Sequence, residues 1–358
     1  MDWVRTDHLH RATMSTTGIL LIQLGTPDAP TATALKPYLR QFLSDPRVIE
    51  TKPYSKSYLL PGQTRIARKS PPAWLWSILL NGIIVPFRSS KSAEKYARVW
   101  DEVSGSPLMH WTKRQTELVQ ARLPETPVRY GMMVGNPSVD SVVQEMLASG
   151  VDRIVAMPMF PQYSSTTTAS ATDALFKTML KLRVVPAVRV VPPYYDHPAY
   201  IDAMAAVIHS DLDTLGWEPE HFVFSFHGIP QKYAQRGDPY ATHVMRTTQA
   251  LVKKLGWPRD KWTQTFQSRF GRDPWLKPYT DDVLETLAKK GVKNVMVMLP
   301  GFTADCLETV DEIGHESEEV FHKAGGIKLR SCACLNDHTK WIDAMETILR
   351  EESRGWIG

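Results

Sequence analysis

The sequence predicts a doubly wound α/β fold with parallel sheets, and three features support this prediction. Its short apolar runs are continuous rather than alternating, as in strands that are buried on both faces. Amphipathic helical segments alternate with these runs, which is the βα order of a parallel sheet. The chain has 358 residues, and at roughly 150 residues per domain this length suggests two domains.

Seven segments are expected to form strands, because each is a short run rich in β-forming residues. In chain order these are residues 18–24, 128–134, 154–160, 187–191, 222–226, 262–267 and 294–299. Helices with one apolar face are expected at residues 138–149, 200–215, 239–255 and 280–290, and a last helix at 340–352.

Clustered prolines suggest where the two halves meet. Pro186, Pro192 and Pro193 follow a helical segment and separate two regions of similar βα content. We therefore expect an N-terminal domain at residues 15–185, a C-terminal domain at 186–336, and a final helical segment at 337–358 that packs back on either half.

Composition excludes some classes of protein. A net charge of +4 with 22% charged residues gives no support for nucleic-acid binding. Charge is nevertheless uneven, since nine Lys and Arg residues but the single acid Glu94 lie between Lys52 and Arg98. That segment can hold anions.

Three cysteines do not make a disulfide framework in a chain of this size, so a reducing, cytoplasmic compartment is expected. Residues 1–17 carry charges and no apolar signal core. The longest apolar run, residues 74–87, has fourteen residues, short of the roughly 20 that cross a bilayer. With its basic flanks it predicts an amphipathic lip that rests on an anionic membrane surface or covers a large flat ligand; the alternative is a buried helix pair.

A row of acids follows the strand at 294–299. Glu308, Glu312 and Glu316 are four residues apart, so their like charges share one helical face and require either solvent or a cation. Glu319 and His315 are expected at the exposed end. A solvated helix face is the structural alternative for the whole row.

His227 ends the strand at 222–226, immediately before Gly228. Ligands in doubly wound folds bind at the carboxyl ends of strands, so His227 and the acidic row are expected to face one crevice, although a capping or core role for the histidine is also open. Imidazole with carboxylates binds first-row divalent metals. Clustered acids also raise one another's pKa and so can accept protons.

Eight short motifs, in order along nearly the whole chain, resemble the ferrochelatase family, whose members insert ferrous iron into a porphyrin. They are residues 21–27 (LIQLGTP), 105–108 (GSPL), 161–164 (PQYS), 225–230 (SFHGIP), 236–240 (RGDPY), 266–271 (FQSRFG), 274–276 (PWL) and 301–309 (GFTADCLET).

The resemblance implies two Rossmann-like domains with the active-site cleft between them. It gives His227 and Glu308 the catalytic roles, without settling which one binds metal and which accepts protons. The implied metal set is His227, Glu308, Glu312 and Glu316, and the helix that carries the three glutamates is wound more widely than an α-helix. The implied porphyrin-pocket residues are Leu24, Arg88, Tyr96, Ser106, Trp275 and Phe302.

The resemblance also implies the reaction: Fe²⁺ and protoporphyrin IX give protoheme (heme b) with release of two protons, as the last step of heme biosynthesis by a lyase. Cys306 beside Glu308 resembles the Gram-negative pattern and favours protoporphyrin. The alternatives are a coproporphyrin ferrochelatase and a non-catalytic tetrapyrrole- or metal-binding protein. No tightly bound cofactor is expected, and no iron–sulfur cluster, since a cluster normally takes four thiolates and the chain has three cysteines.

The sequence departs from the family pattern at two places. Met133 and Val134 stand where bacterial members usually have arginine and tyrosine, which puts propionate contacts there in doubt. The segment at residues 54–70 is longer than usual.

Peripheral contact with the inner membrane is expected through the lip, and the sequence leaves the oligomeric state open.

Overall fold

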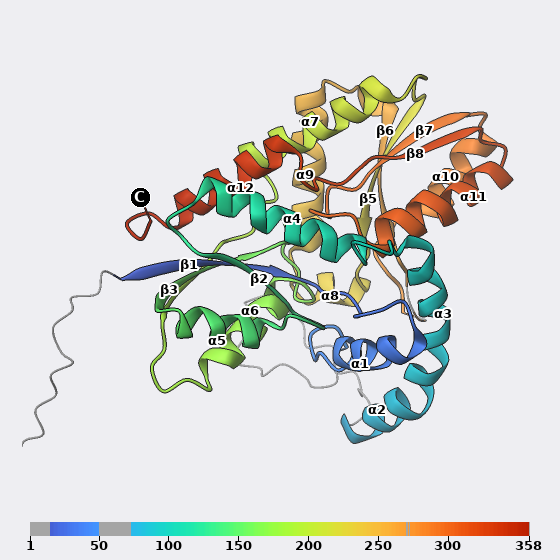
Figure 1. Ribbon diagram of the computed structural model, residues 1–358. Helices are drawn as coiled ribbons and strands as arrows, with labels where there is room; N and C mark the ends of the chain where they lie inside the picture. The colour runs from blue at the N-terminus through green and yellow to red at the C-terminus, as the bar shows by residue number, and fades with distance from the viewer. Residues whose placement is uncertain (1–14, 50–72, 270, 272, 358) are drawn as a thin grey trace, which may run out of the picture.

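The computed structural model describes residues 15–49, 73–269, 271 and 273–357. Two four-stranded sheets organise it, and every pairing within them is parallel (Figure 1). The first sheet has the order β2 (Val128–Met132), β1 (Thr16–Gln23), β3 (Val151–Pro158), β4 (Ala187–Val190). The second has the order β6 (Trp262–Gln267), β5 (His221–His227), β7 (Asn294–Met298), β8 (Lys328–Ser331). The α/β fold with two parallel sheets is confirmed.

Helices cover both faces of the first sheet. Leu20 and Ile22 of β1 pack toward α5 (Val139–Ala148) and α6 (Thr168–Met179). Ile19 and Leu21 point to the opposite face, in a core shared with α4 (Pro107–Arg122) and α12 (Thr339–Glu352). Because both faces are buried, alternate residues of β1 are equally apolar, which is why the strand has no polar alternation.

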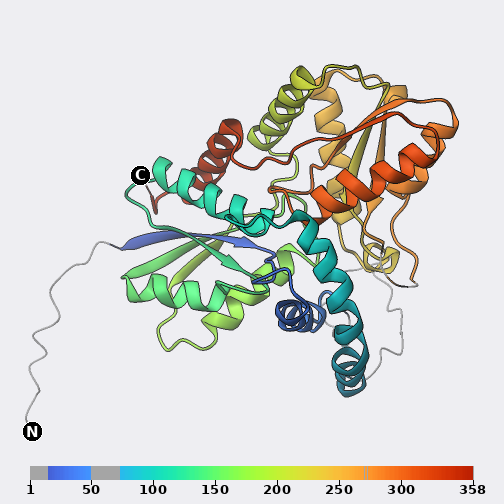
Figure 2. The same ribbon diagram turned by 45° about the vertical axis from the view of Figure 1, so that its right-hand side comes forward.

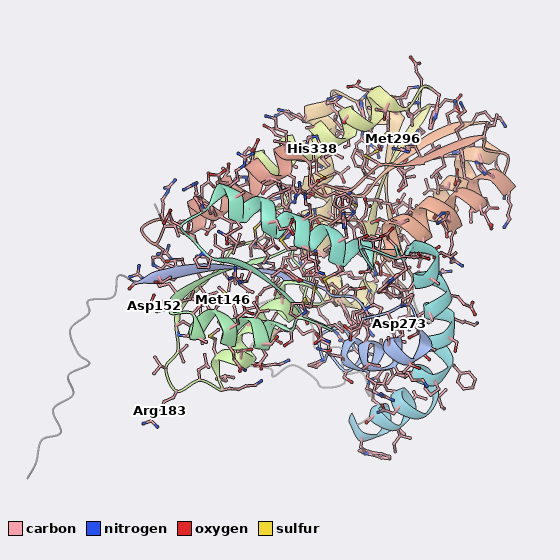
Figure 3. All side chains as sticks on the ribbon, in the orientation of Figure 1. Met146, Asp152, Arg183, Asp273, Met296 and His338 are labelled. Carbon is pink, nitrogen blue, oxygen red and sulfur yellow. The ribbon has the colours of Figure 1, made fainter. Side chains whose placement is uncertain are left out.

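The second sheet is covered in the same way. Val223 and Val297 face α10 (Thr280–Lys289), the π-helix η4 (Glu308–Ser317) and α11 (Glu318–Lys323). Phe224 and Met296 face α7 (Pro198–Thr214) and α9 (Tyr240–Leu255). Figure 3 marks Met296 in this half and Met146 in the other. One apolar cluster runs from the first sheet through these helices to the second, so the two halves share a core.

The boundary expected after residue 185 is wrong, because β4 pairs with β3 and completes the first sheet. Pro186 and Pro192 flank this edge strand, so the proline cluster marks the ends of a strand rather than a junction between domains. The chain crosses to the second sheet through α7.

The final segment packs on both halves, because α12 lies against α7 as well as α4 and the chain end lies on the first sheet. In addition to the packing of α12, the Thr17 hydroxyl donates to the carbonyl of Trp356. Arg189 of β4 stacks on the Trp356 ring and donates to the carbonyl of Arg354. The sequence predicts that this segment packs back on the molecule but does not indicate on which half.

Strand β8 is absent from the sequence-based prediction. Its residues are Lys328, Leu329, Arg330 and Ser331, of which only Leu329 is buried. An edge strand with charged side chains carries little apolar signal, and such charges protect an exposed edge from further pairing. The other strands lie within three residues of their expected ends, the usual uncertainty of such boundaries.

The apolar segment at residues 74–87 forms a projecting arm rather than a buried pair. It comprises α2 (Ala73–Leu79), the π-turn η2 (Leu80–Ile84) and the start of α3 (Val85–Val99). Trp74 is 64% exposed, Ile78 62% and Phe87 75%. Figure 1 shows α2 at the lower edge of the molecule, and Figure 2 shows α3 leading from it to the helix that contains η4. Among the described helices, none is both long and apolar enough to cross a membrane.

The remaining described helices lie near the arm or in loops. They are α1 (Ala32–Leu43), α8 (Gln231–Gln235) and the 3₁₀ turn η3 (Arg259–Lys261). Helix α1 holds the arm, because the Trp76 indole N–H donates to the carbonyl of Leu43 at 3.1 Å.

Candidate active site

A cavity of about 900 Å³ opens where the carboxyl ends of both sheets meet. Its walls include Leu24 after β1, Met159 after β3, His227 at the end of β5 and Ser268 after β6. All ten sequence-predicted site residues line it: Leu24, Arg88, Tyr96, Ser106, His227, Trp275, Phe302, Glu308, Glu312 and Glu316. The fold therefore brings these residues together, while their individual roles stay predictions.

His227 is held in one tautomer. Its Nδ1 lies 2.7 Å from the carbonyl oxygen of Gly228, and a carbonyl can only accept. In the neutral ring Nδ1 therefore carries the proton, which leaves the lone pair on Nε2. Tyr240 fixes the backbone by donating its hydroxyl to the carbonyl of His227 at 2.9 Å. Nε2 is thus prepared to bind a metal or to accept a proton.

Gly228 allows a tight packing beside this ring. A Cβ there would lie 3.0 Å from both the Gln267 carbonyl oxygen and Cε3 of Trp275. The Trp275 ring is 6.2 Å from the His227 ring, centroid to centroid, at an angle of 50°. Its buried indole N–H has no hydrogen-bond partner among the described residues.

Glu308 is the first residue of the π-helix, which is tied to the second sheet. The Gln267 side-chain amide donates to the carbonyl of Glu308 at 3.0 Å and accepts from the Ser225 hydroxyl at 2.7 Å. The π-helix confirms the wide winding that the family resemblance implies. Its wider turns keep Glu308, Glu312 and Glu316 on the side that lines the cavity.

Glu312 is held by two hydrogen bonds from Ser268. The Ser268 N–H donates to one carboxylate oxygen and its hydroxyl to the other, both at 2.6 Å. Ser268 has φ +64°, the left-handed region that few non-glycine residues adopt. Burial raises the pKa of Glu312, and the Ser268 hydroxyl and His227 only partly offset this. Such a carboxylate takes up a proton more readily than a solvated one.

The outer end of the acidic row is paired with cations. Lys95 of α3 lies 2.7 Å from Glu316, and Arg98 binds Asp311 in a two-pronged contact at 2.6 and 2.7 Å and Glu316 at 3.2 Å. These pairs join α3 to η4, whose ribbons meet in Figure 2. The positive charges that pair with Glu316 are therefore supplied by side chains of another helix, α3. His315 and Glu319 are exposed, as predicted.

Breaking the contact between Arg98 and Asp311 should destabilise the protein. The Asp311 side chain is 1% exposed, so Arg98→Met would leave a buried charge poorly paired. We expect the free energy of unfolding in urea to fall by about 1–3 kcal/mol. The matched control is Lys289→Met, which removes an exposed pair with Glu285 and should cost at most about 0.5 kcal/mol. Equal losses in both variants would contradict the buried contact.

Sequence reasoning missed several cavity residues. Tyr38 of α1 meets Tyr96 edge-on, with ring centroids 6.4 Å apart, and its hydroxyl donates to the carbonyl of Gly25. Burial raises the pKa of both tyrosines, so their hydroxyls stay neutral donors. Tyr38 lies in no recognisable motif. Ser268 and Lys95 carried a signal, since the first lies in a family motif and the second in the basic segment.

The two departures from the family pattern have different outcomes. Met133 and Val134 pair with the first strand through backbone bonds to Gln23 and Leu24. Val134 is buried, and neither residue is among the described residues that line the cavity. The longer segment at residues 54–70 lies outside the described residues.

Within the described part of the chain, no three His, Cys, Asp or Glu side chains are arranged to hold a metal ion. The predicted metal set of His227, Glu308, Glu312 and Glu316 shares the cavity but is not a closed protein cage in that part of the chain. Its role toward a metal stays a prediction.

Comparison with known proteins decides the family. The model of the ferrochelatase family matches residues 16–72 and 63–353. The chain belongs to the ferrochelatase family. A ferrochelatase of Mesorhizobium japonicum is 45% identical over 344 residues, covering 95% of this chain and 92% of that one. A ferrochelatase of Klebsiella pneumoniae is 46% identical over 329 residues, covering 92% and 96%.

Solved structures of chelatases share the fold of this ferrochelatase family member. SirB from Bacillus subtilis with Fe³⁺ aligns with a TM-score of 0.52 at 11% identity, over 95% of this chain and 96% of that one. The sirohydrochlorin chelatase SirB from Bacillus subtilis subspecies spizizenii, in complex with cobalt, aligns with a TM-score of 0.51 at 11% identity, over 94% and 95%. The family resemblance and the chelatase fold are thus confirmed, and membership implies insertion of a metal ion into a porphyrin.

Proposed function

We propose that this protein inserts Fe²⁺ into protoporphyrin IX to form protoheme, with release of two protons, as the last step of heme biosynthesis and as a lyase. The observation that carries the proposal is the placement of His227 and the acidic row of η4 on the walls of one cavity. A metal ion and two leaving protons need both kinds of group beside the same ring.

We assign different parts to the two sides of the cavity. His227 accepts a pyrrole proton, because its Nε2 carries the lone pair and its Nδ1–H is engaged by Gly228. Glu308 stands at the inner end of the carboxylate row and guides Fe²⁺ to the ring nitrogens, while Glu312, with its raised pKa, takes up the second proton. Glu316 is paired with Lys95 and serves at the cavity edge.

The cavity walls support protoporphyrin as the substrate. This porphyrin has two vinyl groups where coproporphyrin has two further propionates. Phe42 and Leu43 of α1 and Trp76 of the arm contribute an apolar wall, where a vinyl group packs well and a carboxylate would lose its hydration. Arg88 and Lys91 of α3 lie on the same cavity and suit the two propionates that both porphyrins have. Gram-negative relatives at 45–46% identity are consistent with this choice.

We also propose that no iron–sulfur cluster or other tightly bound cofactor takes part. The three cysteines are one short of the usual four cluster ligands. Cys306, Cys332 and Cys334 are all buried, and burial raises the pKa of each thiol. A metal binds the thiolate rather than the thiol, so these sites are poorly suited to it.

An anaerobic assay of heme formation from Fe²⁺ and protoporphyrin IX tests the proposal. We expect metallation by the purified protein, and a lower kcat/KM with coproporphyrin III. Faster turnover of coproporphyrin III would contradict the substrate assignment. Binding of porphyrin without any metallation would favour the second candidate, a non-catalytic tetrapyrrole-binding protein, for which the differences at Met133 and Val134 are the motivation.

We further propose that the protein works in the cytoplasm and touches the inner membrane through the arm. Trp74 and Ile78 are more than half exposed, and Arg88 and Lys91 follow them on the same continuous helix, which is the composition of an interfacial segment. The oligomeric state is not part of this proposal.

Substituting the arm should weaken membrane binding. Burial of one large apolar side chain contributes about 1.5–3 kcal/mol, so Trp74→Ser with Ile78→Ser should lower partition onto anionic phospholipid vesicles at least about tenfold. The control is Leu180→Ser, which removes an even more exposed apolar side chain after α6. Unchanged co-sedimentation of the double variant would contradict membrane contact through the arm.

A further inference from the structure

A loop at residues 299–307 joins β7 to the π-helix and carries Phe302 just before Glu308. Both halves of the molecule hold this loop at Thr303. The Gln115 side-chain amide of α4 donates to the Thr303 carbonyl at 2.7 Å, and the Thr303 hydroxyl donates to the carbonyl of Met159 at 3.1 Å. The N–H of Asn336, from the other half, reaches the same Thr303 carbonyl at 3.2 Å.

Asn336 also holds the start of the π-helix through Asp305. Its Oδ1 accepts the Asp305 N–H at 2.9 Å, and its Nδ2 donates to the Asp305 carboxylate at 2.6 Å. The other carboxylate oxygen of Asp305 accepts from the Thr309 hydroxyl at 2.8 Å, and that hydroxyl accepts the N–H of Cys306 at 2.9 Å. A continuous chain of hydrogen bonds thus runs from Asn336 to the first turn of η4.

The backbone of Asn336 is adapted to this position. It has φ +43°, a left-handed conformation that asparagine tolerates better than most residues. Its carbonyl accepts a second bond from the Gln115 amide, at 2.8 Å. Gln115 is fully buried, and Asn336 is 8% exposed. Neither side chain is among the residues that line the cavity, so direct contact with substrate is not their part.

We infer that Asn336 and Gln115 are positioning residues, which hold Phe302 and Glu308 at a fixed place relative to the porphyrin. Gln115 lies on α4, whose N-cap is Ser106, a cavity residue of the first half. The clamp of Gln115, Thr303, Asp305 and Asn336 therefore ties the acidic row to the opposite wall. The inference rests on the proposed metal insertion. Metal transfer needs this alignment, because a displacement of about 1 Å can cost about 100-fold in rate.

Asn336→Gly tests the clamp, since glycine keeps the left-handed backbone and removes both side-chain bonds. We expect kcat for Fe²⁺ insertion to fall about 10- to 100-fold, with KM and the dissociation constant for protoporphyrin, from quenching of tryptophan fluorescence, close to wild type. The control is Asn294→Asp, at the opposite end of β7, which should leave kcat unchanged. A variant with lower thermal stability but wild-type kcat would show a structural role only and overturn the inference.

A swapped pair keeps the test decisive if the glycine variant folds poorly. Asn336→Asp alone sets two carboxylates against each other and should lose activity. Adding Asp305→Asn restores the side-chain hydrogen bond with its direction reversed, because the amide at position 305 now donates to the carboxylate at position 336. The double variant should therefore recover most of the kcat. Failure of the double variant to exceed Asn336→Asp would overturn the clamp. Wild-type protein that binds porphyrin without metallating it would instead contradict the proposed function, and the clamp with it.

Discussion

Replacing Glu308 by glutamine is expected to lower kcat for Fe²⁺ insertion by about 10²- to 10⁴-fold, the range typical of lost acid–base groups. The amide keeps the size of the side chain but has no negative charge to attract Fe²⁺ and cannot take up a proton at neutral pH. Binding of protoporphyrin should change little, because the aromatic and apolar walls are untouched. Single-turnover absorbance measurements with bound porphyrin separate the two quantities.

The control for Glu308→Gln is Glu319→Gln, the same chemical change on the exposed continuation of the helix. Its kcat should equal that of wild type. Glu312→Gln should give an intermediate loss, since Glu312 takes up one of the two protons in the proposed mechanism and does not guide the metal. A Glu308→Gln protein that metallates porphyrin at the wild-type rate would contradict the role of Glu308 and leave His227 and Glu312 as the candidates for the chemistry.

Short runs of β-forming residues were enough to predict seven of the eight described strands, and central strands such as β7 are apolar along their length because both of their faces are buried. The same physics explains the failures. Strand β8 lies at a sheet edge and needs little apolar surface. Strand β4 was found but assigned to the wrong half, since pairing partners depend on tertiary contacts that a local pattern does not contain.

The site was more predictable than the domain boundary. His227 ends one strand and Glu308 follows another, and parallel strands place their carboxyl ends at one edge. The family motifs supplied the pocket residues. The hydrogen bonds from Ser268 to Glu312 could not be predicted, because they depend on the left-handed backbone of Ser268 and on the register of a π-helix. Tyr38 reaches the cavity only through the packing of α1.

The structure also answers how a row of like charges is tolerated. Lys95 and Arg98 neutralise its outer end at Glu316, and the N–H and hydroxyl of Ser268 satisfy Glu312 in the middle. For the Glu308 carboxylate no ion pair is found among the described residues. The row is therefore graded, and its least compensated charge lies at the inner end, where an incoming cation would reach the porphyrin.

Replacing His227 by alanine is expected to lower kcat by at least about 100-fold, because it removes the lone pair that accepts the pyrrole proton. The vacated space lies on the cavity wall beside Trp275, so added imidazole can occupy it. We expect imidazole to restore part of the activity in a saturable manner, and to have no effect on Glu308→Gln. The control is His315→Ala, which removes an exposed histidine of the π-helix η4 and should keep wild-type kcat.

Rescue by imidazole separates a chemical role of His227 from a structural one, since a ring that merely packed would be replaced equally well by an apolar molecule such as benzene. If benzene restores the rate as well as imidazole does, His227 shapes the cavity and the proton must leave through the carboxylates of η4.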